Sequence, residues 1–211
     1  MTRPYHHGNL RQALVQTAAD LARERGPQGV VLREVARRTG VSHNAAYRHF
    51  TDRDQLLGEV AVDGMARLAD HMRAATAEVD DPDPVVAARQ RLSATGRAYV
   101  GFALAEPGFF AVAFAEAAHD LMAETIGSQD PVAPSDADPY ALLNLALDDL
   151  VAVGAVTAER REGAEVACWA AVHGFAQLHL GPLREVPAEQ RAQHLEAMLT
   201  VIEQGLVQAE R

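Results

Sequence analysis

The chain has 211 residues, a net charge of −10 and an apolar share of 48%. This ordinary composition provides ample material for a buried core, and Cys168, the only cysteine, excludes an intramolecular disulfide. No basic start is followed by an apolar run, and the longest apolar stretch, residues 98–118, is broken by charged residues, glycine and proline. We therefore expect a cytoplasmic protein without a secretory signal or a membrane-spanning helix.

Apolar residues recur at three- to four-residue spacing along almost the whole chain, and strand-like alternation is missing. The sequence therefore predicts an all-α protein of nine or ten helices. In the first part of the chain, helices are expected at 9–25, 32–39, 42–50, 52–78 and 85–105, followed by one or two from Pro107 to about Ile126. After an irregular stretch at 127–138, three more are expected at 139–154, 159–180 and 188–209.

Two short predicted helices, 32–39 and 42–50, flank a tight turn that begins at Gly40, which is the arrangement of a helix-turn-helix. Gly40 supplies the backbone freedom that the turn requires, and Ser42 is a favourable cap for the second helix. The N-terminal residues of such a second helix meet base edges in the major groove of DNA. We therefore predict DNA contacts from Ser42, His43, Asn44 and Ala45.

The chemistry of these side chains distinguishes two kinds of contact. Asn44 can pair with an adenine edge and Ala45 can touch a thymine methyl group, whereas phosphate contacts fix the register of a protein on DNA. Phosphate contacts are predicted for Tyr47, Arg48 and His49, and the basic face is extended by Arg33, Arg37 and Arg38 on the preceding helix. The alternative is a plain helical hairpin inside a bundle.

The distribution of charge favours DNA. Residues 1–58 carry nine arginines against five acidic residues, whereas the rest of the chain carries ten arginines against twenty-four acidic residues. A basic head on an acidic body indicates that only the head approaches a polyanion. The sequence thus predicts a sequence-specific DNA-binding transcription regulator, and the alternative is an all-α small-molecule-binding or protein-interaction module that does not bind DNA.

The stretch LREVARRTGVSHNAAYRHFTDRDQLL resembles the DNA-binding region of the TetR family of repressors. The matching features are Val35-Ala36, Gly40-Val41-Ser42 and Tyr47-Arg48-His49-Phe50 ahead of a capped helix. The resemblance implies that Asp52 and Arg53 lie near the DNA backbone. It also implies a DNA-binding domain at 1–52 and a helical regulatory and dimerisation domain at 53–211. Val31 departs from the family, which usually has Ser or Thr at that position.

The stretches YVGFALAEPGFF, beginning at Tyr99, and WAAVHG, beginning at Trp169, resemble a TetR subgroup whose C-terminal domain is marked by a tryptophan and a following His-Gly. This resemblance implies a homodimer that binds a palindromic operator as a repressor and is released by a small-molecule effector. Candidate residues of the effector site are Phe102, Phe109, Phe114, Met122, Trp169 and His173. The alternative for these aromatic and methionine residues is ordinary core packing.

The predicted helix 159–180 is apolar nearly all round and must be covered on two sides. The last helix, 188–209, carries its own apolar stripe, so the two could form a four-helix interface in a two-fold dimer. The alternative is a large core within one chain.

Motifs of catalysis and metal binding are missing from the sequence. No nucleophile elbow, phosphate-binding loop or dinucleotide-binding glycine motif occurs, so we expect neither an enzyme nor a cofactor. The nine histidines do not have the spacing of a metal site, and the single cysteine has no cysteine partner. We therefore expect no metal.

Overall fold

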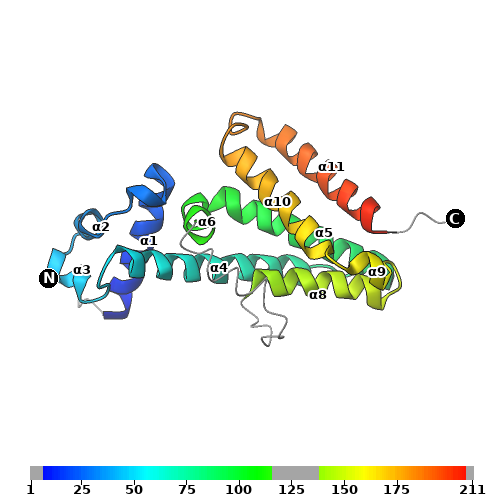
Figure 1. Ribbon diagram of the computed structural model, residues 1–211, viewed down its shortest axis with the longest axis horizontal. Helices are drawn as coiled ribbons and strands as arrows, with labels where there is room; N and C mark the ends of the chain where they lie inside the picture. Colours follow the sequence, from blue (N-terminus) through cyan, green and yellow to red (C-terminus); the bar gives the residue numbers. More distant parts are fainter. Residues whose placement is uncertain (1–6, 116–137, 208–211) are drawn as a thin grey trace. The chain divides into compact units, whose positions relative to one another are not determined.

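The computed structural model describes residues 7–115 and 138–207, and every regular element in these two ranges is helical (Figure 1). The predicted all-α fold is confirmed. The elements are α1 (His7–Arg25), the short 3-10 helix η1 (Pro27–Gly29), α2 (Leu32–Thr39), α3 (His43–Tyr47), α4 (Arg53–Ala77), α5 (Pro84–Ala105), α6 (Pro107–Ala113), α8 (Pro139–Ala152), α9 (Ala158–Arg161), α10 (Ala164–Leu180) and α11 (Ala188–Leu206).

Two predicted helices differ clearly from the structure, one in its end and one in its continuity. The third helix ends at Tyr47 rather than Phe50, because the chain turns there and places the Phe50 side chain in the core, fully buried. The helix predicted at 159–180 is divided into α9 and α10, because Gly163 adopts a left-handed conformation with φ of 72° between them. A positive φ of this kind ends a run of α-helical residues.

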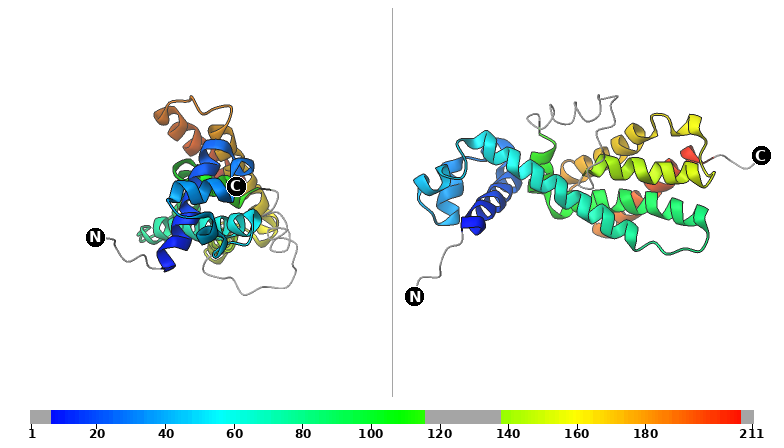
Figure 2. Two further views of the ribbon diagram at one scale, coloured as in Figure 1. Left: turned by 90° about the vertical axis from the view of Figure 1, so that its left-hand side faces the viewer. Right: turned by 90° about the horizontal axis from the view of Figure 1, so that it is seen from below.

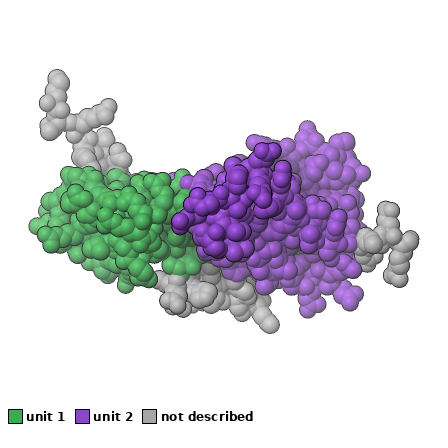
Figure 3. Space-filling model, turned by 90° about the horizontal axis from the view of Figure 1, so that it is seen from above, with its two compact units in different colours: residues 1–65, 106–132 green, residues 66–105, 133–211 purple. Residues whose placement is uncertain are grey.

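The described chain forms two compact units, shown in green and purple in Figure 3. Unit 1 comprises residues 1–65 and 106–132, and unit 2 comprises residues 66–105 and 133–211. The expected division at residues 52 and 53 follows the order of the chain, whereas unit 1 also includes the start of α4 and all of α6.

Unit 1 is built around α1, which packs against α2 on one side and α6 on another. The helix α6 approaches α1 closely at Gly108, where an added Cβ would lie 2.0 Å from the carbonyl oxygen of Ala19. Glycine is therefore required at this crossing. Side chains buried completely in this unit include Leu14, Leu21, Val35, Phe50, Leu56, Phe109 and Phe110.

Unit 2 is a helical bundle in which α8, α10 and α11 pack against α5 (Figures 1 and 2). Its core contains Ala88, Leu92, Leu143, Ala146, Leu147, Leu150, Val156, Ala164, Cys168 and Leu206. Burial raises the pKa of the Cys168 thiol to about 11, so this cysteine is a core residue rather than a reactive one. Within the described residues, no helix is long and apolar enough to cross a membrane.

Candidate nucleic-acid interface

The turn between α2 and α3 is set by two residues. Gly40 has φ of 76° and ψ of 26°, and the N–H of Val41 donates to the carbonyl of Ala36 over 3.0 Å, which closes the end of α2. Ser42 then caps α3, because its Oγ accepts the N–H of Ala45 at 3.2 Å. The helix-turn-helix that the sequence predicts is therefore formed.

The helix α3 buries one side and exposes the other. Ala46 is fully buried and anchors the helix on unit 1. The opposite side presents the exposed residues Ser42, His43, Asn44, Tyr47 and Arg48, with Ala45 and His49 partly exposed beside them. The rings of His43 and Tyr47 lie 4.3 Å apart and form one edge of this surface. The sequence-predicted recognition residues are thus on one accessible face, which we call the α3 face.

The arginines near the α3 face differ in what they contact. Arg33 and Arg48 are exposed, and neither has an ion-pair or hydrogen-bond partner among the described residues. Arg37 donates from Nε and Nη2 to the two carboxylate oxygens of Glu34, at 2.7 and 2.8 Å. Arg33 and Arg48 therefore have their full charge available to a ligand, and Arg37 does not.

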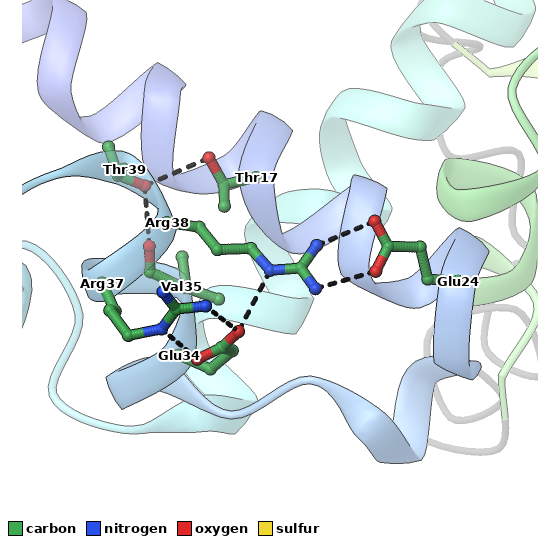
Figure 4. A network of polar contacts seen from close by, with 7 residues as sticks. All are labelled: Thr17, Glu24, Glu34, Val35, Arg37, Arg38 and Thr39. Carbon is green, nitrogen blue, oxygen red and sulfur yellow. Dashed lines mark hydrogen bonds and ion pairs between the residues drawn. The ribbon is translucent and has the colours of Figure 1, made fainter.

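Figure 4 shows that the Arg37–Glu34 pair belongs to a larger network between α1 and α2. Arg38 donates from Nε to Glu34 at 3.1 Å and makes two bonds of 2.8 Å to the carboxylate of Glu24 at the end of α1. Hydrogen bonds from Arg37 and Arg38 lower the pKa of Glu34 to about 2, and the bond from Arg38 lowers the pKa of Glu24. Both carboxylates are therefore ionised at neutral pH.

Arg53, which the family resemblance places near the DNA backbone, is bound to the protein's own backbone. Its Nε donates to the carbonyl of Val30 at 2.9 Å and its Nη2 donates to that of Pro27 at 2.8 Å. The same helix start is capped by Asp52, whose carboxylate accepts the N–H of Gln55 at 2.8 Å. Arg53 thus holds the loop ahead of α2 against the start of α4.

Arg11 is a positioning residue of this region that was not among the residues predicted from the sequence. Its Nη1 donates to the carbonyl of His49 at 2.9 Å, its Nη2 pairs with Glu59 at 2.7 Å, and its guanidinium lies 4.6 Å from the centre of the Phe50 ring. Arg11 therefore fixes the chain that leaves α3. A basic residue in α1 gives no local sign of such a contact, because its partners lie far along the sequence.

Two family models match the chain. The model for bacterial regulatory proteins of the tetR family matches residues 14–60, and the model for a tetracyclin repressor-like C-terminal domain matches residues 92–202, more than half of the chain. The chain belongs to the TetR family. The matches confirm the resemblances drawn from the helix-turn-helix and from the stretches beginning at Tyr99 and Trp169.

Individual relatives within the TetR family are similar over different lengths. An HTH-type transcriptional repressor of Mycobacterium tuberculosis is 46% identical over 57 residues, which are 27% of this chain and 30% of the relative. A structure of a protein of unknown function from Rhodococcus is 29% identical, covers 98% of this chain and all of its own, and has a TM-score of 0.72. The TetR family regulator PfmR from Thermus thermophilus is 18% identical over 92% of this chain and 99% of its own, with a TM-score of 0.64, and shares the fold.

In the TetR family's C-terminal region, the structure brings two predicted effector-site residues together with one that was missed. The hydroxyl of Tyr99 in α5 lies 2.8 Å from Nδ1 of His173, and Nε1–H of Trp169 donates to the same hydroxyl over 3.2 Å. Burial raises the pKa of Tyr99 and lowers that of His173, so both are neutral at pH 7. The three side chains form what we call the Tyr99 cluster, a neutral, aromatic and hydrogen-bonding site in unit 2.

The other predicted effector-site residues lie elsewhere. Phe102 is buried in unit 2, with its ring 5.7 Å from that of His71. Phe109 and Phe114 belong to unit 1, where Phe114 packs against Phe110 at a ring distance of 4.8 Å. Met122 lies outside the described residues. The structure therefore assigns the six predicted residues to no single group. In the described ranges, no group of three or more His, Cys, Asp or Glu side chains could hold a metal ion.

Proposed function

We propose that the protein is a homodimeric transcription repressor, which binds a palindromic operator through the α3 face and is released from it by a small molecule. The observation that carries this proposal is the exposed start of α3 with His43 and Asn44, together with two exposed arginines of the same unit, Arg33 and Arg48, that have no ion-pair partner among the described residues. Base-reading groups flanked by free cations are what a major-groove contact requires. The name of the mycobacterial relative, a repressor, supports the same direction of regulation.

The roles divide along the α3 face. We assign base-edge contacts to Ser42, His43, Asn44 and Ala45, because they form the first turn of the recognition helix. Phosphate contacts are assigned to Tyr47, Arg48 and His49, which follow that turn in the chain, and to the exposed Arg33 at the start of α2. Arg53 keeps its place in the site as a positioning residue, since its Nε and Nη2 already bind the carbonyls of the loop at Pro27–Val30.

The DNA contact is tested by a mobility shift with the promoter region of the protein's own gene at several salt concentrations. Affinity should fall steeply with salt, because each phosphate contact releases counterions. Tyr47→Phe should weaken binding to all sequences, and Asn44→Ala should relax preference at one base pair of each half-site. Binding that does not depend on salt, or no binding to any duplex, would overturn the proposal.

Unit 2 supports a dimer through the outer sides of α10 and α11. Three large apolar side chains lie exposed there, namely Val166 and Leu178 on α10 and Val201 on α11, the last with 69% of its surface accessible. Burying such a surface against a second copy is favourable. A two-fold dimer would also present two recognition helices to major grooves about 34 Å apart.

The dimer is tested by sedimentation equilibrium of Val201→Arg. The change should convert a dimer into a monomer, because it places a charge in the buried interface. Val62 in α4 is a matched control, since it is also a valine of high exposure, at 60%. A Val62→Arg protein that remains dimeric beside a monomeric Val201→Arg supports the assignment, and a wild-type monomer at micromolar concentration contradicts it.

The Tyr99 cluster supports the effector site, because a small molecule with a polar group could exchange hydrogen bonds with Tyr99, Trp169 and His173. Phe102 and the other predicted aromatic residues remain candidates for apolar contacts. A library screened by thermal shift identifies a stabilising compound, which is then added to the protein–DNA complex. His173→Phe should lose the response and keep operator binding. A compound that binds at His173 without weakening the complex would overturn release as the mechanism.

A further inference from the structure

We propose that Glu34 restrains Arg37 from the DNA backbone and thereby limits the sequence-independent part of the protein's affinity for DNA. This inference rests on the proposed DNA contact of the α3 face and concerns how strongly that face binds DNA of any sequence. It differs from the role that charge alone suggests for Arg37, which is a phosphate contact. Glu34 is in this view a residue that limits affinity without touching DNA.

The geometry of the pair explains the restraint. Arg37 is highly exposed, with 71% of its side-chain surface accessible, so a ligand can reach it. Its Nε and Nη2 nevertheless lie side-on to the Glu34 carboxylate at 2.7 and 2.8 Å. The remaining N–H groups of the guanidinium still face solvent, but the carboxylate beside them offsets their charge.

Glu34 is itself fixed by a second arginine. Arg38 binds Glu34 at 3.1 Å and is anchored to Glu24 by two further bonds, so the carboxylate cannot simply swing away when a phosphate approaches Arg37 (Figure 4). A carboxylate held in this way costs less side-chain entropy than one in an isolated surface pair. It also repels an approaching phosphate directly.

The exposed arginines of the DNA-binding region therefore contribute differently to DNA binding. Arg33 and Arg48 have no carboxylate partner in the described residues and provide the phosphate contacts. Phosphate contacts add affinity for every sequence, whereas base contacts add affinity only for the operator. Withholding Arg37 therefore lowers the affinity for every duplex by a similar factor, and with it the amount of protein held on random DNA.

The experiment compares four proteins: wild type, Glu34→Gln, Arg37→Ala and the double variant. Each is titrated by fluorescence anisotropy against a duplex of the promoter region and against a random duplex of equal length, at several salt concentrations. Glu34→Gln should bind both duplexes more tightly, by a similar factor, because the added contact is independent of sequence. For a dimer that gains two phosphate contacts, the slope of log affinity against log salt should steepen by about 1.8.

The double-mutant cycle separates release of Arg37 from a simple change in charge. Arg37→Ala alone should change affinity less than about twofold, and in the Glu34→Gln background it should remove the gain. Asp20→Asn is the control, because it removes one acidic charge from α1, where Asp20 pairs with Arg23, and leaves the Arg37–Glu34 pair and its support by Arg38 in place. It should leave the salt slope unchanged. Thermal unfolding of all variants checks that the head stays folded.

Three outcomes would overturn the inference: a Glu34→Gln protein with wild-type affinity and slope, a gain that persists without Arg37, or an Arg37→Ala protein that binds DNA severalfold more weakly. Failure of the proposed function looks different, because wild type would then not prefer the promoter duplex over the random one. The random duplex alone still reports the slopes in that case. Absence of binding to either duplex by all four proteins would overturn both.

Discussion

The α3 face and the Tyr99 cluster are assembled in opposite ways. The α3 face depends on neighbours in the chain: Gly40 ends one helix and Ser42 starts the next, within three residues. In the Tyr99 cluster, Trp169 lies 70 positions and His173 lies 74 positions after Tyr99 in the sequence. A site built from local conformation can be found in a sequence by its turn and cap residues, whereas a site built by packing becomes visible only when the helices are placed.

The largest expected effect tests whether the stability of unit 1 depends only on local turn residues or also on a contact between helices far apart in the sequence. Gly108→Ala would place a Cβ 2.0 Å from the carbonyl oxygen of Ala19, so α6 must move away from α1. We expect a loss of about 3 kcal/mol of unfolding free energy, the upper end for overpacking, measured by urea denaturation. Such a loss would show that unit 1 depends on one long-range crossing as much as on its turn.

The control for that change is Gly101→Ala. Gly101 is an exposed residue of α5, and an added Cβ would meet no atom within 4 Å. Here alanine should stabilise the helix by about 0.5–1 kcal/mol. If both variants lost stability equally, the close approach at Gly108 would not be the cause.

The second prediction concerns the Tyr99 cluster, which is formed by the packing of helices far apart in the sequence. Tyr99→Phe removes the hydroxyl that bridges Trp169 and His173, and we expect a loss of about 1–2 kcal/mol. Trp169 is the only tryptophan, so a shift in its emission reports the same change. Tyr140→Phe is the matched control, because the Tyr140 ring also lies against Trp169, at 6.2 Å. Equal emission shifts in the two variants would contradict a specific role for the Tyr99 hydroxyl.

The third prediction concerns the α3 face, whose position depends on the turn at Gly40. Gly40→Ala introduces no steric contact, since nothing lies within 4 Å of the added Cβ, but φ of 76° remains unfavourable for alanine. We expect a loss of about 1 kcal/mol and weaker operator binding. Gly40→Asn should lose less, because asparagine tolerates the left-handed region. An alanine variant as stable as wild type would mean that the turn does not require its observed conformation.

The α3 face and the Tyr99 cluster differ in how far their residues can be predicted from the sequence. Helical spacing predicts nearly every helix, and the recognition residues follow from the turn at Gly40. Charge placed Arg37 on the basic face and the family resemblance placed Arg53 near the DNA backbone, although Glu34, three residues before Arg37, is a local sign of pairing. For Arg53 the adjacent Asp54 is a local partner, at 3.1 Å, but its two backbone acceptors lie more than twenty positions away and leave no local sign. Tyr99 was missed for the same reason.

The smallest expected effect is a gain at the start of α2, again from a purely local feature. Val31 occupies the capping position with φ of −127° and ψ of 126° and makes no side-chain bond, so Val31→Thr adds a hydroxyl where it can accept a helix N–H. Glu34 stands three residues later, where a capping box would use it, but the two arginines already hold its carboxylate. Only half of the capping box can then form, so we expect a gain of about 0.5 kcal/mol in urea denaturation. Val62→Thr, on an exposed helix interior, should give none, and a loss at Val31 would show that its exposed methyl groups contribute more than a cap.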